Sequence, residues 1–224
     1  MKTIINVILA VSALGLLYLC YNSLMEPIQF NEMRAAREAA VKERLIQIRE
    51  AQEQFKNQND GFYCDSLHKL IDFVKTAKIA FVSKEGVLTD EQMDKGLTES
   101  SAAAIVNSGD AKAIAANGLE GFRRDTTWVA LIDSLYEDGF VADSLAFIPF
   151  SEGEQFEMQV SHVQTRSGIT QWVMECGAKY AQYLKGTSKR EIYNLTDEAD
   201  KMSRYPGLKI GDLYSNNNNA GNWE

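Results

Sequence analysis

Histidine and cysteine are scarce in this sequence, which contains two histidines and three cysteines among its 224 residues. The motifs of several common chemistries are absent: HExxH for zinc proteases, CxxC for dithiol exchange, GxSxG for serine hydrolases, and the GxxxxGKS/T and GxGxxG loops for phosphates and dinucleotides. His68, His162 and the carboxylate pair Glu152 and Glu154 fit ordinary structural or solvated positions. We therefore expect a protein that is not an enzyme, without catalytic, cofactor-binding or metal-binding residues.

Positive charge is also in deficit, because 23 Lys and Arg stand against 31 Asp and Glu and the formal net charge is −8. A protein that binds nucleic acid neutralises phosphates with a basic surface, so we expect no nucleic-acid partner. Hydrophobic residues make up 45% of the chain. This length and composition predict one folded domain of ordinary size together with a further segment.

Charge is almost absent from residues 1–25, where Lys2 is the only charged side chain. Residues 3–25 are an uncharged run of 23 residues, and as a helix they cover about 34 Å against a hydrocarbon core of about 30 Å. We predict a transmembrane helix in the lipid bilayer, because a cleaved signal peptide has a shorter apolar core and a small-x-small cleavage site. Cys20 follows Leu19 and not the small residue of a lipobox, so we interpret it as a small apolar side chain.

Two features bear on the orientation of this helix. Basic residues beyond the apolar run favour a cytoplasmic domain by the positive-inside rule, and they are Arg34, Arg37, Lys42 and Arg44. A short amino-terminal tail with one Lys before a long apolar run is instead typical of an uncleaved signal anchor, which sends the following chain across the membrane. We expect a single-pass membrane protein with residues 1–26 as the anchor and with its domain on the opposite side of the membrane from the amino terminus.

An amphipathic stalk helix is predicted over residues 27–57, where Pro27 should kink or interrupt the helix because it lacks an N–H and its ring clashes with the preceding turn. Apolar positions recur there at spacings of three, four and seven between charged residues. The apolar stripe comprises Phe30, Met33, Val41, Leu45, Ile48 and Phe55. It has two interpretations: it packs on the protein's own domain, or it pairs with a helix of a second copy or of a partner subunit as in a coiled coil.

The remaining chain predicts an α+β fold, in which a small antiparallel sheet packs with short helices over residues 58–214. Amides and a glycine at residues 57–61 should end the stalk helix. Residues 83–124 are rich in Ala, Gly, Ser and Asp and predict an insertion of small helices and loops. Two further helices are expected, over Leu67–Val74 and over Thr196–Tyr205 with Asn194 or Thr196 as its cap.

Strands are predicted where β-branched or aromatic residues cluster, and Phe156, Met158 and Val160 alternate with polar residues as on one face of a sheet. The expected strands are Lys78–Val82, Thr126–Leu131, Leu145–Phe150, Gln155–Gln164, Thr170–Cys176, Glu191–Asn194 and Leu208–Tyr214. A hairpin turn is expected at Arg166–Gly168. Residues 215–224 form a polar tail, and we expect Trp223 to dock onto the domain as a terminal anchor.

Cys64 and Cys176 lie outside the apolar segment. In an oxidising compartment they are a candidate disulfide between the first helix of the domain and the sheet, whereas in the cytoplasm they should be free thiols.

A short pattern of Asp, then Ser or Thr, then a further residue that is usually apolar occurs four times. One interpretation is structural, because Asp and Ser cap helices and form turns. The other is that the pattern resembles the acceptor site of a general bacterial periplasmic O-glycosylation system. The candidate O-glycosylation residues are Ser66, Thr126, Ser134 and Ser144.

Several runs resemble an uncharacterised family of single-pass, signal-anchored periplasmic proteins of Gram-negative bacteria: KERLIQIREAQEQF, GFYCDSLHKLIDFVK, RRDTTWVALIDSL, PFSEGEQFEM, YPGLKIGDL and NAGNWE. The layout of an apolar helix, an amphipathic helix and a sheet is also loosely similar to type IV pilins, pseudopilins and the assembly-platform subunits of type II secretion. The processing site of pilins is absent, since no Gly-Phe precedes the apolar run and Ile5 and Asn6 stand where their Glu is expected.

These observations lead to three functional hypotheses. The first is a non-enzymatic, membrane-anchored envelope protein that acts through protein–protein contacts in a periplasmic assembly, such as a pilus-like or secretion apparatus, with other membrane or periplasmic proteins or a second copy as partners. The alternative is a membrane-tethered sensor, or a domain that binds a ligand or a cell-wall component. The third is a membrane-tethered hydrolase that uses Asp, Glu or His.

Overall fold

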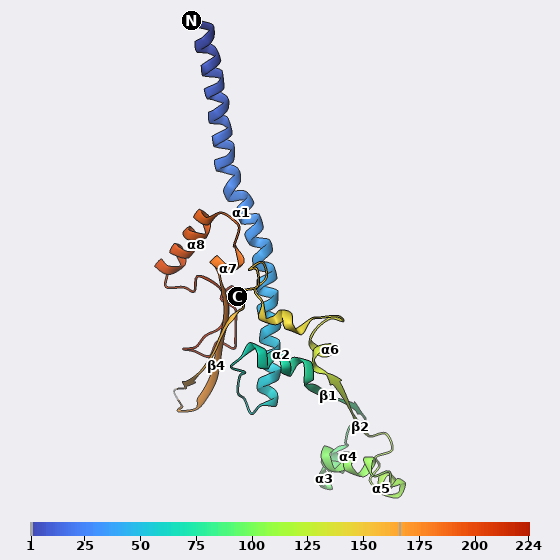
Figure 1. The fold of residues 1–224 in the computed structure, drawn as a ribbon. Helices are drawn as coiled ribbons and strands as arrows, with labels where there is room; N and C mark the ends of the chain where they lie inside the picture. The colour runs from blue at the N-terminus through green and yellow to red at the C-terminus, as the bar shows by residue number, and fades with distance from the viewer. Residues whose placement is uncertain (1, 166) are drawn as a thin grey trace. The chain divides into compact units, whose positions relative to one another are not determined.

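The structure is a computed structural model that describes residues 2–165 and 167–224, without the side chains at positions 2–5, 7, 8, 10 and 22. It is mixed α+β with small antiparallel sheets, as predicted. The chain divides into two compact units (Figure 1). Unit 1 comprises the chain up to Val74 together with Val141–Glu224, and unit 2 comprises Lys75–Phe140.

One long helix, α1 (Lys2–Gln58), dominates unit 1 and contains Pro27 in its interior. The predicted interruption at Pro27 is wrong, because the loss of one N–H removes one helical hydrogen bond and the turns on both sides continue. Separate boundaries for an anchor of residues 1–26 and a stalk of residues 27–57 therefore do not appear in the backbone. The helix ends as predicted, where Asp60 and Gly61 have positive φ and the Gly61 N–H donates to the Lys56 carbonyl at 3.0 Å.

Beside α1, unit 1 contains an antiparallel sheet in the order β3-β4-β5 and several short helices. The strands are β3 (Glu157–Gln164), β4 (Thr170–Lys179) and β5 (Gly207–Gly211). The helices are α2 (Leu67–Thr76), whose last two residues belong to unit 2, η1 (Ala142–Ala146), α7 (Tyr180–Tyr183) and α8 (Lys189–Lys201). The carboxyl-terminal half of α1 packs against β4, β5, η1 and α7, which places the core of unit 1 along this half.

The apolar stripe of α1 lies largely in this core. Phe30 is 3% exposed, Val41, Leu45 and Ile48 are fully buried, and Phe55 is half-buried with its ring against Phe73. Met33 is 43% exposed. Of the two interpretations of the stripe, packing on the protein's own domain holds for the buried residues, and they are not accessible to a second helix.

Two predicted strands are wrong. Leu145–Phe150 is the end of η1 followed by irregular chain, in which Phe147 forms a single bridge to Gln155. Glu191–Asn194 lies inside α8, which begins at Lys189 with Ser188 as its N-cap, seven residues before the predicted Thr196. Helical spacing outweighs β propensity there, because Ile192, Leu195 and Ala199 share one face. At the predicted hairpin turn, Arg166 lies outside the described residues, and the Thr165 N–H donates to the Ile169 carbonyl.

Unit 2 is a two-stranded antiparallel ribbon with a small helical head. The ribbon pairs β1 (Lys78–Glu85) with β2 (Arg123–Ala130), and α6 (Leu131–Leu135) follows β2. The head contains α3 (Asp90–Asp94), α4 (Glu99–Asn107) and α5 (Ala111–Ala116) around a core of Leu88, Ala102, Leu119 and Phe122. The predicted insertion at 83–124 does contain small helices, but the compact unit is larger, because the ribbon pairs residues on both sides of that segment.

The polar tail is part of unit 1. Asn219 is 6% exposed and Gly221 bridges to Ile210 of β5. Trp223 is half-buried, with the Lys42 Nζ of α1 at 5.8 Å from its ring centroid, and Glu224 pairs with Arg49 at 2.8 Å. Trp223 thus docks onto the domain, as expected.

Candidate functional site

The amino-terminal half of α1 presents large apolar side chains on every side of the helix. Each of the following is 61–69% exposed: Leu9, Val11, Leu14, Leu16, Leu17, Tyr18, Leu19, Tyr21 and Leu24. Consecutive residues are among them, and consecutive positions on a helix point about 100° apart. In the part of the chain that the structure describes, no helix has a stretch both long and apolar enough to cross a membrane. The transmembrane helix remains a prediction from the full sequence.

A junction between α1 and the loop before α8 lies directly after this apolar segment. The Ser188 hydroxyl donates to the Glu26 carboxylate at 2.8 Å. Arg37 donates through Nη1 to the carbonyls of Tyr183 at 3.0 Å and Lys185 at 2.8 Å. A groove of about 480 Å³ lies at this junction, lined by Tyr21, Met25, Gln29, Met33 and residues 186–188 among others.

A larger cleft, of about 600 Å³, opens in unit 1 between α1, α7, α8 and the start of β5. Its charged lining comprises Arg34, Glu198, Arg204 and Lys209, and its aromatic lining comprises Tyr180 and Tyr205. Its volume lies within the range of small-molecule sites, about 300–1,000 Å³, but such sites are mostly apolar and the lining of this one is mixed polar and apolar.

Two of the four charged side chains of the cleft are already paired, and among the described residues the Glu198 carboxylate has no ion pair. Arg34 contacts Glu38 at 2.7 Å and Lys209 contacts Glu175 at 2.6 Å. Arg204 is different, because among the described residues its exposed guanidinium has no hydrogen bond or ion pair. These contacts leave one unpaired cation at the cleft.

Tyr205 at the same cleft has a buried hydroxyl without a hydrogen-bond partner among the described groups. Burial raises the pKa of this hydroxyl above its usual value, so it stays protonated at neutral pH. A Cβ at Gly177 would lie 2.8 Å from the Tyr205 oxygen, so the ring requires glycine beneath it. The cleft can therefore offer Arg204 to an anionic group.

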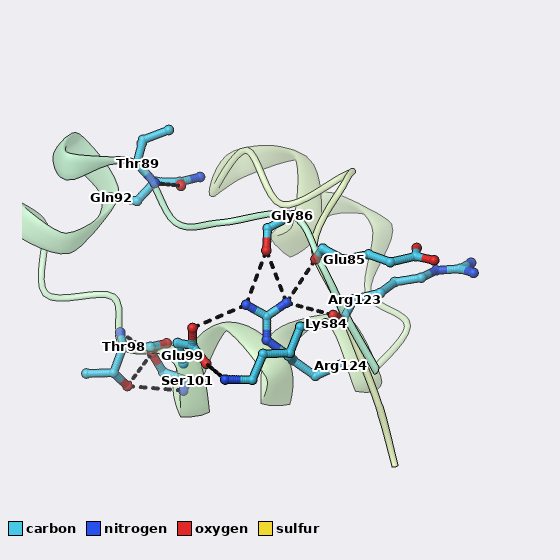
Figure 2. A network of polar contacts seen from close by, with 10 residues as sticks. All are labelled: Lys84, Glu85, Gly86, Thr89, Gln92, Thr98, Glu99, Ser101, Arg123 and Arg124. Carbon is cyan, nitrogen blue, oxygen red and sulfur yellow. Dashed lines mark hydrogen bonds and ion pairs between the residues drawn. The ribbon is translucent and has the colours of Figure 1, made fainter. Parts of the chain in front are cut away.

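In unit 2, a single guanidinium connects the ribbon to the helical head (Figure 2). Arg124 donates to the carbonyls of Glu85, Gly86 and Arg123 at 2.7–3.2 Å and to the Glu99 carboxylate of α4 at 3.3 Å. Its side chain is 8% exposed and stacks on the Phe122 ring at 3.9 Å. The Glu99 pKa is lowered by the Arg124 hydrogen bond and by the charges of Lys84 and Arg124. This network is structural, because its donors are directed at the protein's own backbone.

The ribbon itself exposes apolar side chains on both faces. Phe81 is 51% exposed, Val82 is 47% exposed and Trp128 is 63% exposed. Trp128 pairs with Ala80, the neighbour of Phe81, so the two aromatic side chains point to opposite faces. Within the described chain, β1 and β2 pair only with each other, so each strand has one edge without a neighbouring strand. An exposed edge of this kind is a template for pairing with another chain.

In the structure Cys64 and Cys176 are both buried and are not bonded to each other, and the candidate disulfide stays a prediction that depends on the compartment. Burial raises the pKa of both thiols, and it does so most strongly at the fully buried Cys176. Cys64 donates its thiol hydrogen to the Ser66 carbonyl at 3.2 Å. Sequence spacing alone carries no information on the burial or the separation of the two cysteines.

The candidate O-glycosylation residues lie in four different settings. Thr126 on β2 and Ser134 on α6 are exposed. Ser66 is half-buried directly before α2, and its carbonyl accepts from the Leu70 N–H, as its interpretation as a capping residue implies. Ser144 is half-buried within η1, where its hydroxyl donates to the Val141 carbonyl at 2.6 Å. Two of the four hydroxyls are therefore open to solvent.

The two histidines lie in different surroundings, and His68 lines a pocket of about 330 Å³ together with Asp72 and Asp143. His68 is exposed on α2, and the His162 ring lies 5.6 Å from Trp172 on the neighbouring strand. Within the described residues, no group of three or more His, Cys, Asp or Glu is arranged to hold a metal ion. Sequence reasoning missed Arg204 and Arg124, and the only hint of the latter was a basic pair placed directly after Phe122.

Comparison with known proteins found no relative: no family model and no curated protein matches the sequence, and no solved structure matches the fold.

Proposed function

We propose that this protein is a non-enzymatic, membrane-anchored envelope protein that acts through protein–protein contacts in a periplasmic assembly. Residues 3–25 are its anchor in the inner membrane and the folded units lie on the periplasmic side. The observation that carries this proposal is the division of α1. Apolar side chains surround its amino-terminal half and remain exposed, whereas its carboxyl-terminal half is amphipathic and packs against unit 1.

The physical argument is the cost of that exposed half in water. Burial of a large apolar side chain is worth about 1.5–3 kcal/mol, and nine such side chains are exposed on one helix. A helix that is apolar all round is typical of a membrane span or of the core of a large protein. The 23 uncharged residues match the thickness of a bilayer.

The ribbon of unit 2 is the surface that we assign to partner contact. A two-stranded ribbon alone is marginally stable in water, and here both faces and both outer edges are open. Addition of an extended segment of a partner to one edge would satisfy backbone groups and cover Phe81 or Trp128. The hydrogen bonds of Arg124 fix the end of the ribbon that joins the helical head, which keeps the two strands positioned for partner contact.

Copurification after crosslinking in native membranes tests the proposal. The full-length chain should retain a stoichiometric partner, and F81S/W128S should lose it. The matched control is M93S, which changes an apolar residue of the same unit with 50% exposure outside the ribbon. Retention of the partner by F81S/W128S, or a wild-type chain that remains a monomer without partners, would contradict the proposal.

A second candidate function, binding of a ligand or cell-wall component, is favoured by the 600 Å³ cleft and its unpaired Arg204. The ligand class is an anionic peptide or sugar, because a guanidinium suits carboxylates and phosphates. Calorimetric titration with soluble cell-wall fragments tests it. Binding by the wild-type chain that weakens about tenfold in R204A supports the site, and unchanged binding in R204A excludes the cleft.

A further inference from the structure

The chain at the start of α8 contacts α1 directly after its apolar segment, residues 3–25. Glu26 directly follows residues 3–25, and its carboxylate accepts the hydrogen bond of Ser188, the N-cap residue of α8, at 2.8 Å. Figure 1 shows this end of α8 close to α1. If residues 3–25 span the bilayer, Ser188 lies at the membrane surface.

The loop that carries this end of α8 is fixed to α1 by a second contact. Arg37 lies three helical turns after Glu26, and its two hydrogen bonds reach the carbonyls of Tyr183 and Lys185. Its guanidinium also lies over the Phe150 ring at 5.2 Å. Glu26 and Arg37 of α1 therefore both hold the loop that leads into α8. These contacts keep the first residues of α8 near the end of the apolar segment.

Two exposed cations follow Ser188 directly. Within the described residues, Lys189 and Arg190 have no hydrogen bond or ion pair from their side chains. Their neighbour Lys185 differs, because it pairs with Glu152 at 2.8 Å. The Glu26 carboxylate accepts from Ser188, and Glu191, the next residue along α8, accepts from Asn194 at 3.4 Å. The two cations are thus available for an external anion.

Exposed tyrosine side chains lie near the end of the apolar segment and near the start of α8. Tyr18 and Tyr21 near the end of the apolar segment are 65% and 61% exposed, and Tyr193, the fifth residue of α8, is 70% exposed. Tyrosine is enriched where a bilayer meets water, because its ring is apolar and its hydroxyl is polar. Anionic lipid headgroups at this level carry phosphates, to which Lys and Arg bind.

We propose that Lys189 and Arg190 bind the phosphates of anionic lipid headgroups, so that unit 1 rests on the membrane surface beside its own anchor. This inference rests on the proposed membrane anchor. A juxtamembrane cation strengthens binding to an anionic surface by about fivefold, so the pair should contribute about thirtyfold. The proposed ligand is the anionic lipid surface. Inorganic phosphate in solution carries the same charged group, and the test must distinguish it from the lipid.

The test uses the full chain reconstituted in vesicles of phosphatidylcholine alone or of phosphatidylcholine and phosphatidylglycerol at about 7:3. Amide hydrogen exchange is measured over residues 186–193. We expect slower exchange in the anionic vesicles, by about the thirtyfold factor that the two cations supply, and no such difference in K189E/R190E. K189R/R190K should retain the effect. K201E, at the far end of α8, is the matched control and should also retain it.

Flotation of the vesicles separates the two proposals. A chain that fails to float with either vesicle overturns the anchor and the headgroup site together. A chain that floats but exchanges equally in both vesicles, or whose protection survives K189E/R190E, overturns the headgroup site alone. Protection in neutral vesicles on addition of inorganic phosphate also overturns it, because the site would then be a phosphate site without preference for the lipid surface.

Discussion

The side-chain amide of Gln52 forms two hydrogen bonds with the backbone of Cys64. Gln52 Nε2 donates to the Cys64 carbonyl, and the Cys64 N–H donates to Gln52 Oε1, both at 2.9 Å. Gln52 is fully buried and Cys64 is 2% exposed. This pair connects the last turns of α1 to the segment that leads into α2, so it fixes how the chain reverses direction after the long helix.

Replacement of Gln52 by Leu should destabilise unit 1 by about 1–3 kcal/mol, because it leaves the buried N–H and carbonyl of Cys64 without partners. Denaturant unfolding of the full chain in detergent measures the loss. E53L is the matched control, since Glu53 is the exposed neighbour on the same helix. Equal stability of Q52L and E53L would show that the pair contributes nothing.

Replacement of Arg124 should loosen the head of unit 2 without unfolding unit 1. R124A removes every hydrogen bond that the guanidinium forms, and R124K keeps the charge but loses the planar fork. We expect protection of the α4 amides against hydrogen exchange to fall by about 1–3 kcal/mol in both variants. K84A is the control, because Lys84 and Glu99 are both exposed and lie 3.6 Å apart, and it should have little effect. Unchanged protection in R124A would refute this role.

Sequence periodicity predicted much of the fold. The apolar spacing of Val41, Leu45 and Ile48 identified the apolar face of α1 but left open whether it packs on the domain or on a partner helix. The alternation at Phe156, Met158 and Val160 identified β3. Propensity failed where another pattern was stronger, as at Glu191–Asn194, whose β-favouring residues lie in a helix because the next apolar positions continue at helical spacing.

The contacts that define the candidate site were beyond prediction for a different reason. Glu26 and Ser188 are 162 residues apart, and Arg37 reaches carbonyls 146 and 148 residues away. Backbone carbonyls carry no side-chain identity, so no pattern in the sequence marks them as partners. The burial of Cys64 and Cys176 is likewise not encoded by their spacing in the sequence.

The carboxyl group of Glu99 should titrate below the usual midpoint of about 4.3, because Arg124 and Lys84 stabilise its charged form. Its folded pKa is lower than its unfolded pKa, so its contribution to stability is complete above the unfolded pKa and is lost as the pH falls through the folded pKa. A carbon NMR titration of the side-chain carboxyl measures the midpoint. R124A should return it toward 4.3, and a normal midpoint in the wild-type chain would contradict the network.

The thiols of Cys64 and Cys176 should react slowly with maleimide in the folded protein, because burial raises their pKa and blocks access. Denaturant should make both react rapidly, and mass spectrometry of the digested protein identifies the labelled residues. A peptide with Cys64 linked to Cys176, found in protein purified without reductant, would show instead that the disulfide forms.

The anchor is the central claim, and alkaline carbonate extraction of membranes tests it most directly. The full chain should stay in the membrane pellet, whereas a chain that begins at Glu26 should appear in the supernatant, because it lacks the apolar segment but keeps the buried stripe of α1. Release of the full chain into the carbonate supernatant would contradict the account.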